Sequence, residues 1–208
     1  MFLKERFSKC CNRLTGDLKL VENLWSELDK RYCEKSRFYH NFDHLKCMFS
    51  ELDDIKNNIE NFQAVSFAVF YHDVIYNAVS KSNEEKSAEV ARKNLQKLGF
   101  DSTFIQKVSD QIIATKFHKQ SDDNDINYLL DADLSILGSE SEKYVSYTQK
   151  IRKEYSIYPD LLYKPGRKKV LEHFLKYESI FKTEYFKEKY ELRARENILS
   201  EIESLSLG

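Results

Sequence analysis

Glycine and proline are scarce in this chain. Its 208 residues include five Gly and two Pro, whereas average usage would give about fourteen and ten. The turns and bulges that connect β-strands therefore have little material. The scarcity favours an all-α fold, and the length fits a single domain.

Long apolar runs and blocks of one charge are also missing. The longest apolar stretch, 64–71, is interrupted by Ser66 and is far shorter than the roughly 20 residues that a membrane-spanning helix needs. Lys and Arg alternate with Glu and Asp, and the formal net charge is −1, so we expect no nucleic-acid duplex as a partner. The N-terminus carries Lys4, Glu5 and Arg6 before any apolar stretch, which is unlike a signal peptide. These features predict no membrane partner.

The four cysteines lack the spacing of a disulfide framework or a zinc site. They contain no C-x-x-C motif. Reduced thiols are typical of the cytoplasm, which is the predicted localisation. The cysteines are Cys10, Cys11, Cys33 and Cys47.

Apolar residues recur at helical spacing along most of the chain. Segment 62–75 is apolar on nearly every side and is expected to be the central buried helix. We predict an all-α bundle of roughly eight or nine helices forming one domain, 1–208, with a core of about 17–138 and C-terminal helices 139–205 packed as a cap. One apolar stripe is expected on segment 17–34, through Leu18, Val21, Leu24, Trp25, Leu28 and Tyr32, and another on 40–59, through Leu45, Met48, Phe49 and Leu52.

Capping patterns and glycines suggest where helices begin and end. The S/T-x-x-E/Q spacing occurs at Ser82–Glu85, Thr103–Gln106 and Ser139–Glu142, where side chain and backbone can cap one another. Gly99 and Gly138 stand where C-terminal cap glycines are expected. Pro159 and the Pro165-Gly166 pair predict the one loop of the C-terminal third.

Three segments place titratable side chains beside apolar ones. His72-Asp73 follows the most hydrophobic helix, where an unpaired carboxylate would cost several kcal/mol. A buried His–Asp hydrogen bond, or a helix end that reaches solvent, would explain that pair without a ligand. His40 and His44 are four apart and would share a helix face. A zinc protease would need a Glu after the first His, and Asn41 stands there.

The third segment, 129–137, contains two acids within an apolar run. Residues two apart on a helix point in nearly opposite directions. Asp133 shares its stripe with Leu129, Leu130 and Leu137 and is the expected buried acid. Asp131 is expected to be a helper or a solvated residue.

Taken in order, His44, His72-Asp73 and Asp133 give an H…HD…D pattern that resembles the HD superfamily of metal-dependent phosphohydrolases. The likeness to bacterial predicted HD phosphohydrolases spans about 37–200. It implies that His44, His72, Asp73 and Asp133 bind metal. The matching segments are 37–41 with His44, 70–73, 83–88, 115–118, 131–138, 151–155 and 166–167.

Histidine and carboxylate ligands suit Mn²⁺, Fe²⁺, Zn²⁺ or Mg²⁺. Asp73 could bridge to a second ion, with His118 and His40 as extra ligands or phosphate contacts, so one or two ions are expected. The YHN-x-x-H stretch is also similar to the opening motif of cyclic-nucleotide phosphodiesterases, which implies that His40 protonates the leaving group.

The resemblance implies hydrolysis of a phosphoester in a small phosphorylated metabolite, with a nucleotide favoured. His40, Asp73 and Lys116 are the expected catalytic residues. The substrate-binding candidates are Asn83, Glu84, Arg152 and Arg167. Each cation could equally lie on a solvated helix face, and Asn83 could only help to cap a helix.

Two other functions stay open, an HD-type di-iron oxygenase and a nucleotide-sensing module whose metal site is not catalytic. An exposed stripe on the C-terminal helices could also support a homodimer. His173, among Leu171, Phe174 and Leu175, is expected to be a core or rim histidine rather than a ligand.

Overall fold

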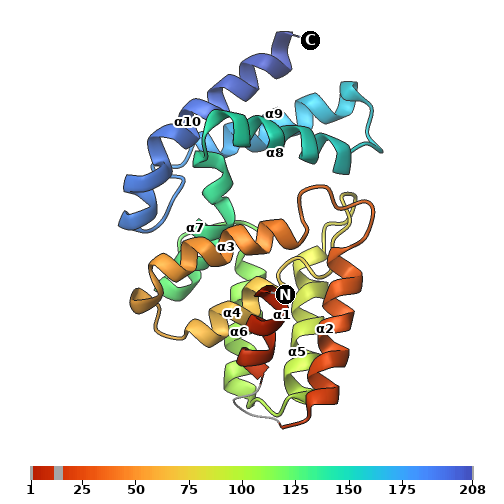
Figure 1. Cartoon of the computed structure of the whole chain (residues 1–208). Coiled ribbons are helices and arrows are strands. Elements are labelled where there is room, and N and C mark those ends of the chain that lie inside the picture. The colour runs from red at the N-terminus through yellow and green to blue at the C-terminus, as the bar shows by residue number, and fades with distance from the viewer. Residues whose placement is uncertain (1, 12–15, 208) are drawn as a thin grey trace.

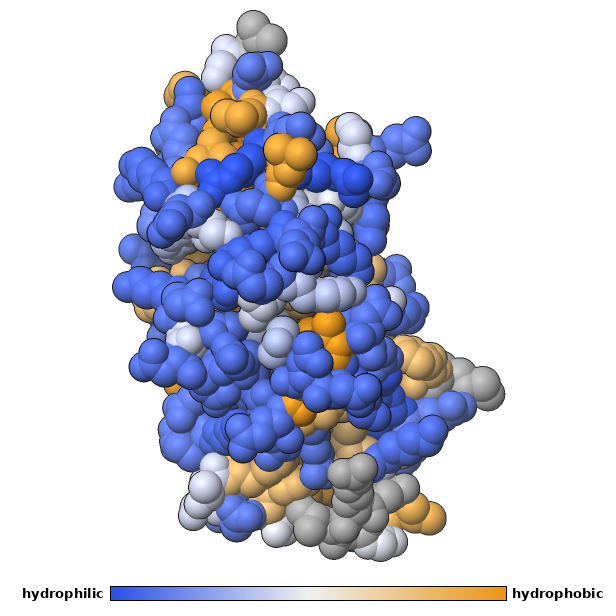
Figure 2. Space-filling model, turned by 90° about the vertical axis from the view of Figure 1, so that its left-hand side faces the viewer, coloured by the Kyte–Doolittle hydropathy of each residue, from blue (hydrophilic) through white to orange (hydrophobic). Residues whose placement is uncertain are grey.

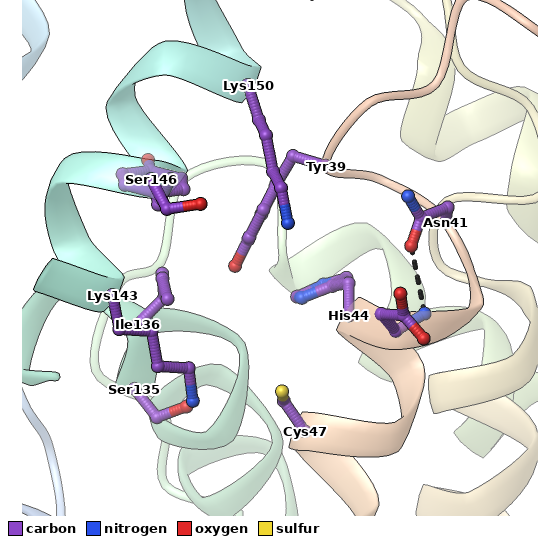
Figure 3. Close-up of a pocket in the computed structure, with 11 residues that line it drawn as sticks. Tyr39, Asn41, His44, Cys47, Ser135, Ile136, Lys143, Ser146 and Lys150 are labelled. Atoms are coloured by element: carbon purple, nitrogen blue, oxygen red, sulfur yellow. Dashed lines mark hydrogen bonds between the residues drawn. The ribbon is translucent and has the colours of Figure 1, made fainter.

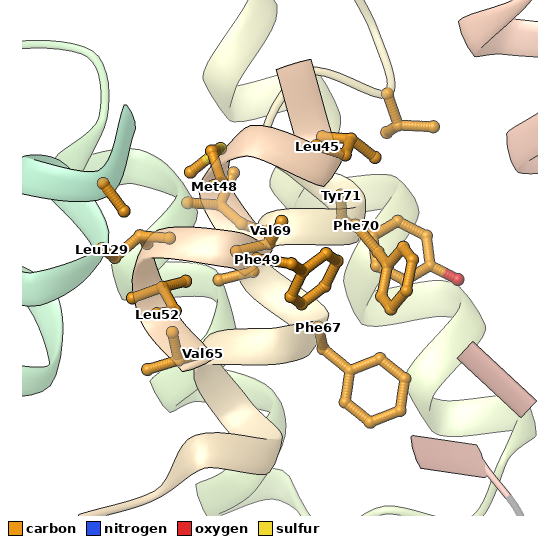
Figure 4. Close-up of a cluster of buried hydrophobic side chains, with 14 of the residues drawn as sticks. Leu45, Met48, Phe49, Leu52, Val65, Phe67, Val69, Phe70, Tyr71 and Leu129 are labelled. Atoms are coloured by element: carbon orange, nitrogen blue, oxygen red, sulfur yellow. The ribbon is translucent and has the colours of Figure 1, made fainter. Parts of the chain in front are cut away.

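The most hydrophobic segment of the chain forms the centre of the fold. In the computed structural model, which describes residues 2–11 and 16–207, this segment is helix α4 (Phe62–Tyr71), and every side chain from Ala64 to Tyr71 is buried. A helix that is apolar on all sides needs neighbours on all sides. Helices α1, α3, α5, α6 and α7 pack around it, and Figure 4 shows aromatic and aliphatic side chains filling the space between them. The predicted central helix is confirmed.

The described residues form ten α-helices and two short 3₁₀ helices, without a strand, in a single compact domain. The all-α prediction is confirmed, with slightly more helices than expected. Besides α4 the elements are α1 (Phe2–Cys11), α2 (Leu18–Tyr32), α3 (Phe42–Asp54), η1 (Lys56–Asn58), α5 (Asn83–Lys97), α6 (Ser102–Ala114), α7 (Asn124–Leu134), η2 (Ser135–Gly138), α8 (Ser141–Glu154), α9 (Asp160–Leu175) and α10 (Glu184–Leu207).

Helices α8, α9 and α10 lie together at one end of the molecule, and α1 to α6 lie at the other (Figure 1). Helix α7 and η2 connect the two groups, and α10 packs on both η2 and α9. The hydrophobic core begins before residue 17, because Leu3 and Phe7 of α1 are buried in it. Residues 1, 12–15 and 208 of the expected domain lie outside the described residues.

The outer surface is mainly polar. Figure 2 shows a face on which hydrophobic residues form small separate groups among hydrophilic ones. None of the helices in the described ranges has the length and apolar content to cross a membrane.

Several local predictions were wrong. Pro165 and Gly166 lie inside α9 rather than in a loop. The predicted caps fail in detail, because α6 begins after Asp101 and α8 after Glu140, while Ser82 occupies the cap position of α5 without a side-chain hydrogen bond. Gly99 does end its helix, with a φ of +85°. Leu18 is 71% exposed, so the buried stripe of α2 begins at Val21.

Candidate metal centre

Three helices bring two imidazoles and a carboxylate to one point. His44 lies in the first turn of α3, His72 ends α4 as its C-cap, and Asp133 lies in the last turn of α7. One potential ligand atom from each residue lies within 4.8 Å of the others. The Nε2 atom of His44 is 3.0 Å from Oδ1 of Asp133 and 3.3 Å from Nε2 of His72. This group can hold a metal ion.

The ring of His72 is oriented for ligation. Its Nδ1 lies 2.9 Å from the carbonyl oxygen of Val69. A carbonyl oxygen only accepts hydrogen bonds, so Nδ1 carries a proton and donates it. A hydrogen bond of this kind fixes the tautomer that leaves Nε2 available to a metal.

Negative charge surrounds these imidazoles. Burial would lower the pKa of His72, but the carboxylates of Asp73 and Asp133 outweigh burial and raise it to about 9. Burial likewise opposes ionisation of Asp133, yet its hydrogen bonds with His118 and His44 hold its pKa well below the usual range. The cluster therefore favours a positive charge at its centre.

Asp73 and His118 flank the three converging residues. Oδ2 of Asp73 lies 3.1 Å from Nε2 of His72. Nε2 of His118 lies 2.8 Å from Oδ2 of Asp133, on the other oxygen from the one that faces His44. Three of the four expected ligands therefore converge on one point, and Asp73 and His118 lie beside them.

His118 adopts an unusual backbone conformation. Its φ is +48°, and no other non-glycine residue in the described ranges has a positive φ. This conformation costs an L-residue about 1–2 kcal/mol. It follows the end of α6 and places the imidazole against Asp133. Strain of this kind is typical of functional positions.

His40 reaches the site from a loop rather than from a shared helix face. Asn41 is the N-cap of α3, and its side chain accepts a hydrogen bond from the backbone N–H of Asp43. The helical argument for the His40–His44 pair was therefore wrong, although the two rings still lie 6.0 Å apart.

Glu154 of α8 fixes His40. One carboxylate oxygen accepts the backbone N–H groups of Tyr39 and His40, and the other lies 2.6 Å from Nδ1 of His40 and accepts the Tyr76 hydroxyl at 3.0 Å. The Tyr76 ring also stacks on His40, with centroids 4.2 Å apart. Burial would lower the pKa of His40, but Asp73 and Glu154 together raise it.

Glu154 and Arg37 were not among the predicted site residues. Arg37 is buried and donates to the carbonyl oxygens of His40, Asp73 and Val74. It therefore ties the loop of His40 to the segment that follows His72. Both residues lie in segments that resemble HD phosphohydrolases. In the sequence, each is marked only by the aromatic residue that follows it, Phe38 after Arg37 and Tyr155 after Glu154.

The roles expected for the two acids of α7 must be corrected. Asp131 is completely buried, whereas the Asp133 side chain keeps 15% exposure at the site. The Asp131 carboxylate accepts the backbone N–H groups of Lys182 and Thr183 and the hydroxyl of Thr183, each at 2.8 Å. Asp131 is thus a structural acid that anchors the start of α10.

A pocket of about 750 Å³ opens beside the cluster. Its polar end includes His40, His72, Asp73, His118 and Asp133. Aromatic and aliphatic side chains of η2, α8, α9 and the loop between α8 and α9 form the opposite wall.

The predicted substrate residues are distributed unevenly around this pocket. Asn83, Glu84, Lys116 and Arg167 line it, and Arg152 does not appear among the described residues that do so. Arg152 instead binds Asp160 and the carbonyl oxygens of Tyr155 and Tyr158. It therefore stabilises the turn between α8 and α9.

Most of these polar groups already have protein partners. Lys116 binds the Glu85 carboxylate and the carbonyl oxygen of Lys81. Arg167 lies in a helix, not in the expected loop, and its guanidinium holds Glu201 by two bonds of 2.8 and 3.1 Å.

The amide group of Asn83 pairs with the backbone of Asn77 instead of capping its helix. His173 is exposed, bonds Tyr177 and is absent from the described pocket lining.

A smaller pocket, of about 90 Å³, lies on the other side of His44 (Figure 3). Lys143, Lys150 and Cys47 line it. Tyr39 and Tyr147 line both pockets and so separate them.

No model of a known protein family, no curated protein and no solved structure matches this chain.

Proposed function

We propose that the protein is a metal-dependent phosphohydrolase of the HD superfamily. The observation that carries the proposal is the convergence of His44, His72 and Asp133, two of which, His72 and Asp133, line a large pocket. These residue types and their order along the chain are those that the resemblance to HD phosphohydrolases requires.

The ligand set supports one or two divalent ions. Imidazole and carboxylate ligands suit Mn²⁺, Fe²⁺, Zn²⁺ or Mg²⁺. His44, His72, Asp73 and Asp133 would hold the first ion. Asp73 would bridge to a second, with His118, which lies against Asp133, as an extra ligand. A divalent ion supplies Lewis acidity that activates water for attack on a phosphate ester.

His40 is placed to act as the general acid. Its Nδ1 faces the Glu154 carboxylate, so Nε2 is the nitrogen left to donate to a ligand in the pocket. Asp73 and Glu154 raise the pKa of His40 above its usual value, which favours the protonated form of the ring. A protonated imidazole can donate to the leaving oxygen as the phosphoester bond breaks.

Lys116 and Asp73 complete the proposed catalytic set. Lys116 lines the pocket, and positive charge there would stabilise phosphoryl oxygens. Its ion pair with Glu85 fixes its position and reduces its net charge.

The substrate is proposed to be a small phosphorylated metabolite, with a nucleotide as the favoured class. A cytoplasmic location stays a prediction, and so does a homodimer. Leu192 and Leu199 are exposed and seven residues apart on α10, so they share one face. Light scattering of the wild type and Leu199→Glu tests whether that face joins two copies.

The decisive experiment combines metal analysis with Mn²⁺-dependent phosphate release from a panel of nucleotides and simple phosphoesters. Asp73→Ala is expected to abolish both metal content and hydrolysis, whereas His40→Ala should retain metal and slow turnover. His173→Ala is the matched control, because this exposed histidine lies outside the pocket lining. Equal metal loss in the Asp73 and His40 variants would contradict the assigned roles.

Other outcomes would favour the other functions. Metal-bound protein that consumes O₂ and releases no phosphate would support the di-iron oxygenase. Protein that binds metal and a nucleotide without turnover would support the sensing module.

A further inference from the structure

We infer that the pocket accepts a single phosphate group attached to a flat, apolar and uncharged body. This inference rests on the proposed function and narrows its substrate class, because an apolar body disfavours the polar sugar of the nucleotide named there. It follows from the shape of the pocket lining and from the charges around it.

The pocket has two chemically different ends. The imidazoles and carboxylates of the metal cluster form one end. Much of the remaining lining offers apolar surface, including Phe174, whose ring centroid is 6.4 Å from that of His118. The other such residues are Ile151, Tyr155, Tyr158, Leu162 and Val170. A ligand that contacts both parts of the lining must combine a polar head, beside the histidines and aspartates, with an apolar body.

The apolar wall is open to a ligand. Leu162 and Val170 line the pocket, yet they are 61% and 48% exposed. Covering such surface is favourable in proportion to the apolar area removed from water. Tyrosine and phenylalanine rings present flat faces, which pack well against a flat ring of a ligand.

The charges of the lining oppose a polyanion. The lysine and the arginine of the described lining are already paired, Lys116 with Glu85 and Arg167 with Glu201, and His40 in the same lining faces Glu154. Glu84, Asp73 and Asp133 add negative charge to the same lining. A divalent ion would balance the two aspartates, so little positive charge remains for a second or third phosphate.

Several polar groups of the pocket lining already have hydrogen-bond partners within the protein. The Tyr76 hydroxyl donates to Glu154, and the Tyr147 hydroxyl accepts from Arg167. Asn83 pairs with the backbone of Asn77. These groups therefore have fewer hydrogen bonds to offer to a ligand.

The test measures binding of three phosphonates to the Mn²⁺-loaded protein by calorimetry. Methylphosphonate has almost no body, benzylphosphonate has a flat apolar one, and 4-carboxybenzylphosphonate has a similar body with a charge. Their C–P bond resists hydrolysis, so binding is read apart from turnover. Benzylphosphonate should bind at least tenfold more tightly than the other two.

Two neighbouring leucines provide a matched pair of variants. Leu162 lines the pocket and Leu161, which is 84% exposed, is absent from the described lining. Leu162→Ser should reduce the preference for benzylphosphonate severalfold, whereas Leu161→Ser should leave it unchanged. Both side chains are exposed, so neither change should prevent folding.

Phosphate release from the corresponding phosphoesters is measured in parallel. Hydrolysis without a preference among the phosphonates would overturn the inference and leave the proposed function intact. A preference for benzylphosphonate without any hydrolysis would support the ligand class and contradict the phosphohydrolase. Equal loss of preference in the two leucine variants would also overturn the inference.

Discussion

The carboxylate of Glu154 lies 2.6 Å from Nδ1 of His40, although 114 residues separate the two in the chain. Glu154 belongs to α8, at the same end of the molecule as α9 and α10, whereas His40 precedes α3 beside the candidate metal ligands. The contact therefore joins the two ends of the molecule at the candidate active site. The same carboxylate fixes the backbone of residues 39 and 40.

Replacing Glu154 by Gln tests this pairing through pH. Glu154 raises the pKa of His40, and a general acid is active only while protonated. Activity is thus lost as pH rises through the His40 pKa, and Glu154→Gln should lower that pKa and move the alkaline limb of the kcat/KM profile to lower pH. Turnover at alkaline pH should fall severalfold, and NMR titration of the His40 ring measures the pKa directly.

Tyr76→Phe is the control for this experiment. It removes one hydrogen bond to Glu154 but keeps the carboxylate and the stacked ring, so the alkaline limb should move less. An alkaline limb that stays in place in Glu154→Gln would exclude His40 as the titrating acid. Metal content should be equal in all three proteins.

The neighbouring acids Asp131 and Asp133 should separate stability from metal binding. Asp131→Ala leaves two backbone N–H groups and one hydroxyl without their acceptor, which should cost about 2–4 kcal/mol of unfolding free energy. Asp133→Asn changes a proposed metal ligand and should weaken metal affinity by about 100-fold or more, beyond the usual loss of an outer-shell partner. Urea unfolding and metal titration measure the two effects.

The opposite result would assign Asp131, rather than Asp133, to the metal site. Specifically, metal loss in folded Asp131→Ala with normal binding in Asp133→Asn would contradict the geometry. The unfolding measurements are made with a chelator present, because bound metal would itself stabilise the folded state.

The sequence was sufficient to predict the hydrophobic centre and the cluster beside it. Segment 62–71 is apolar over nearly its whole surface, and few folds can bury such a helix except beneath other helices. His72 and Asp73 follow it directly, so their position was determined as soon as that helix was recognised.

The surroundings of the site depended on contacts that span much of the chain. No residue close to Glu154 in the sequence indicates that it accepts a hydrogen bond from His40. Likewise, none close to Asp131 indicates that residues 182 and 183 donate hydrogen bonds to it. Helical periodicity predicts on which side of its helix a side chain lies, but not which residue of another element it contacts. This is why Asp131 and Asp133 were assigned the wrong exposures.

Substitutions of His118 should show a trade-off between the stability of the fold and metal binding. Its positive φ suits glycine but is unfavourable for a side chain with a Cβ atom. In metal-free protein, His118→Gly should therefore be more stable than His118→Ala by about 1 kcal/mol. Both variants lack the imidazole beside Asp133 and should bind less metal, which a titration with Mn²⁺ would detect. Equal stability of the two variants would show that the conformation carries no strain.

Gly138 and Gly166 should respond oppositely to alanine. A Cβ atom at Gly138 would lie 2.5 Å from Cβ of Tyr190 and 2.7 Å from its carbonyl oxygen, so η2 and α10 would have to separate. Overpacking of this kind costs about 1–3 kcal/mol. Nothing lies within 4 Å of a Cβ atom at Gly166, which is inside α9, and alanine there should stabilise the helix by about 0.5–1 kcal/mol.

Urea unfolding of the two alanine variants would measure this contrast. Gly138→Ala should also lower phosphate release, because η2 follows Asp133 directly and its displacement would move that carboxylate. A destabilised Gly166→Ala would mean that residues 165 and 166 form a loop in solution, as their sequence suggests. A neutral Gly138→Ala would mean that α10 does not pack closely on η2, and the wall of the pocket formed by α8 and α9 would then lack its support.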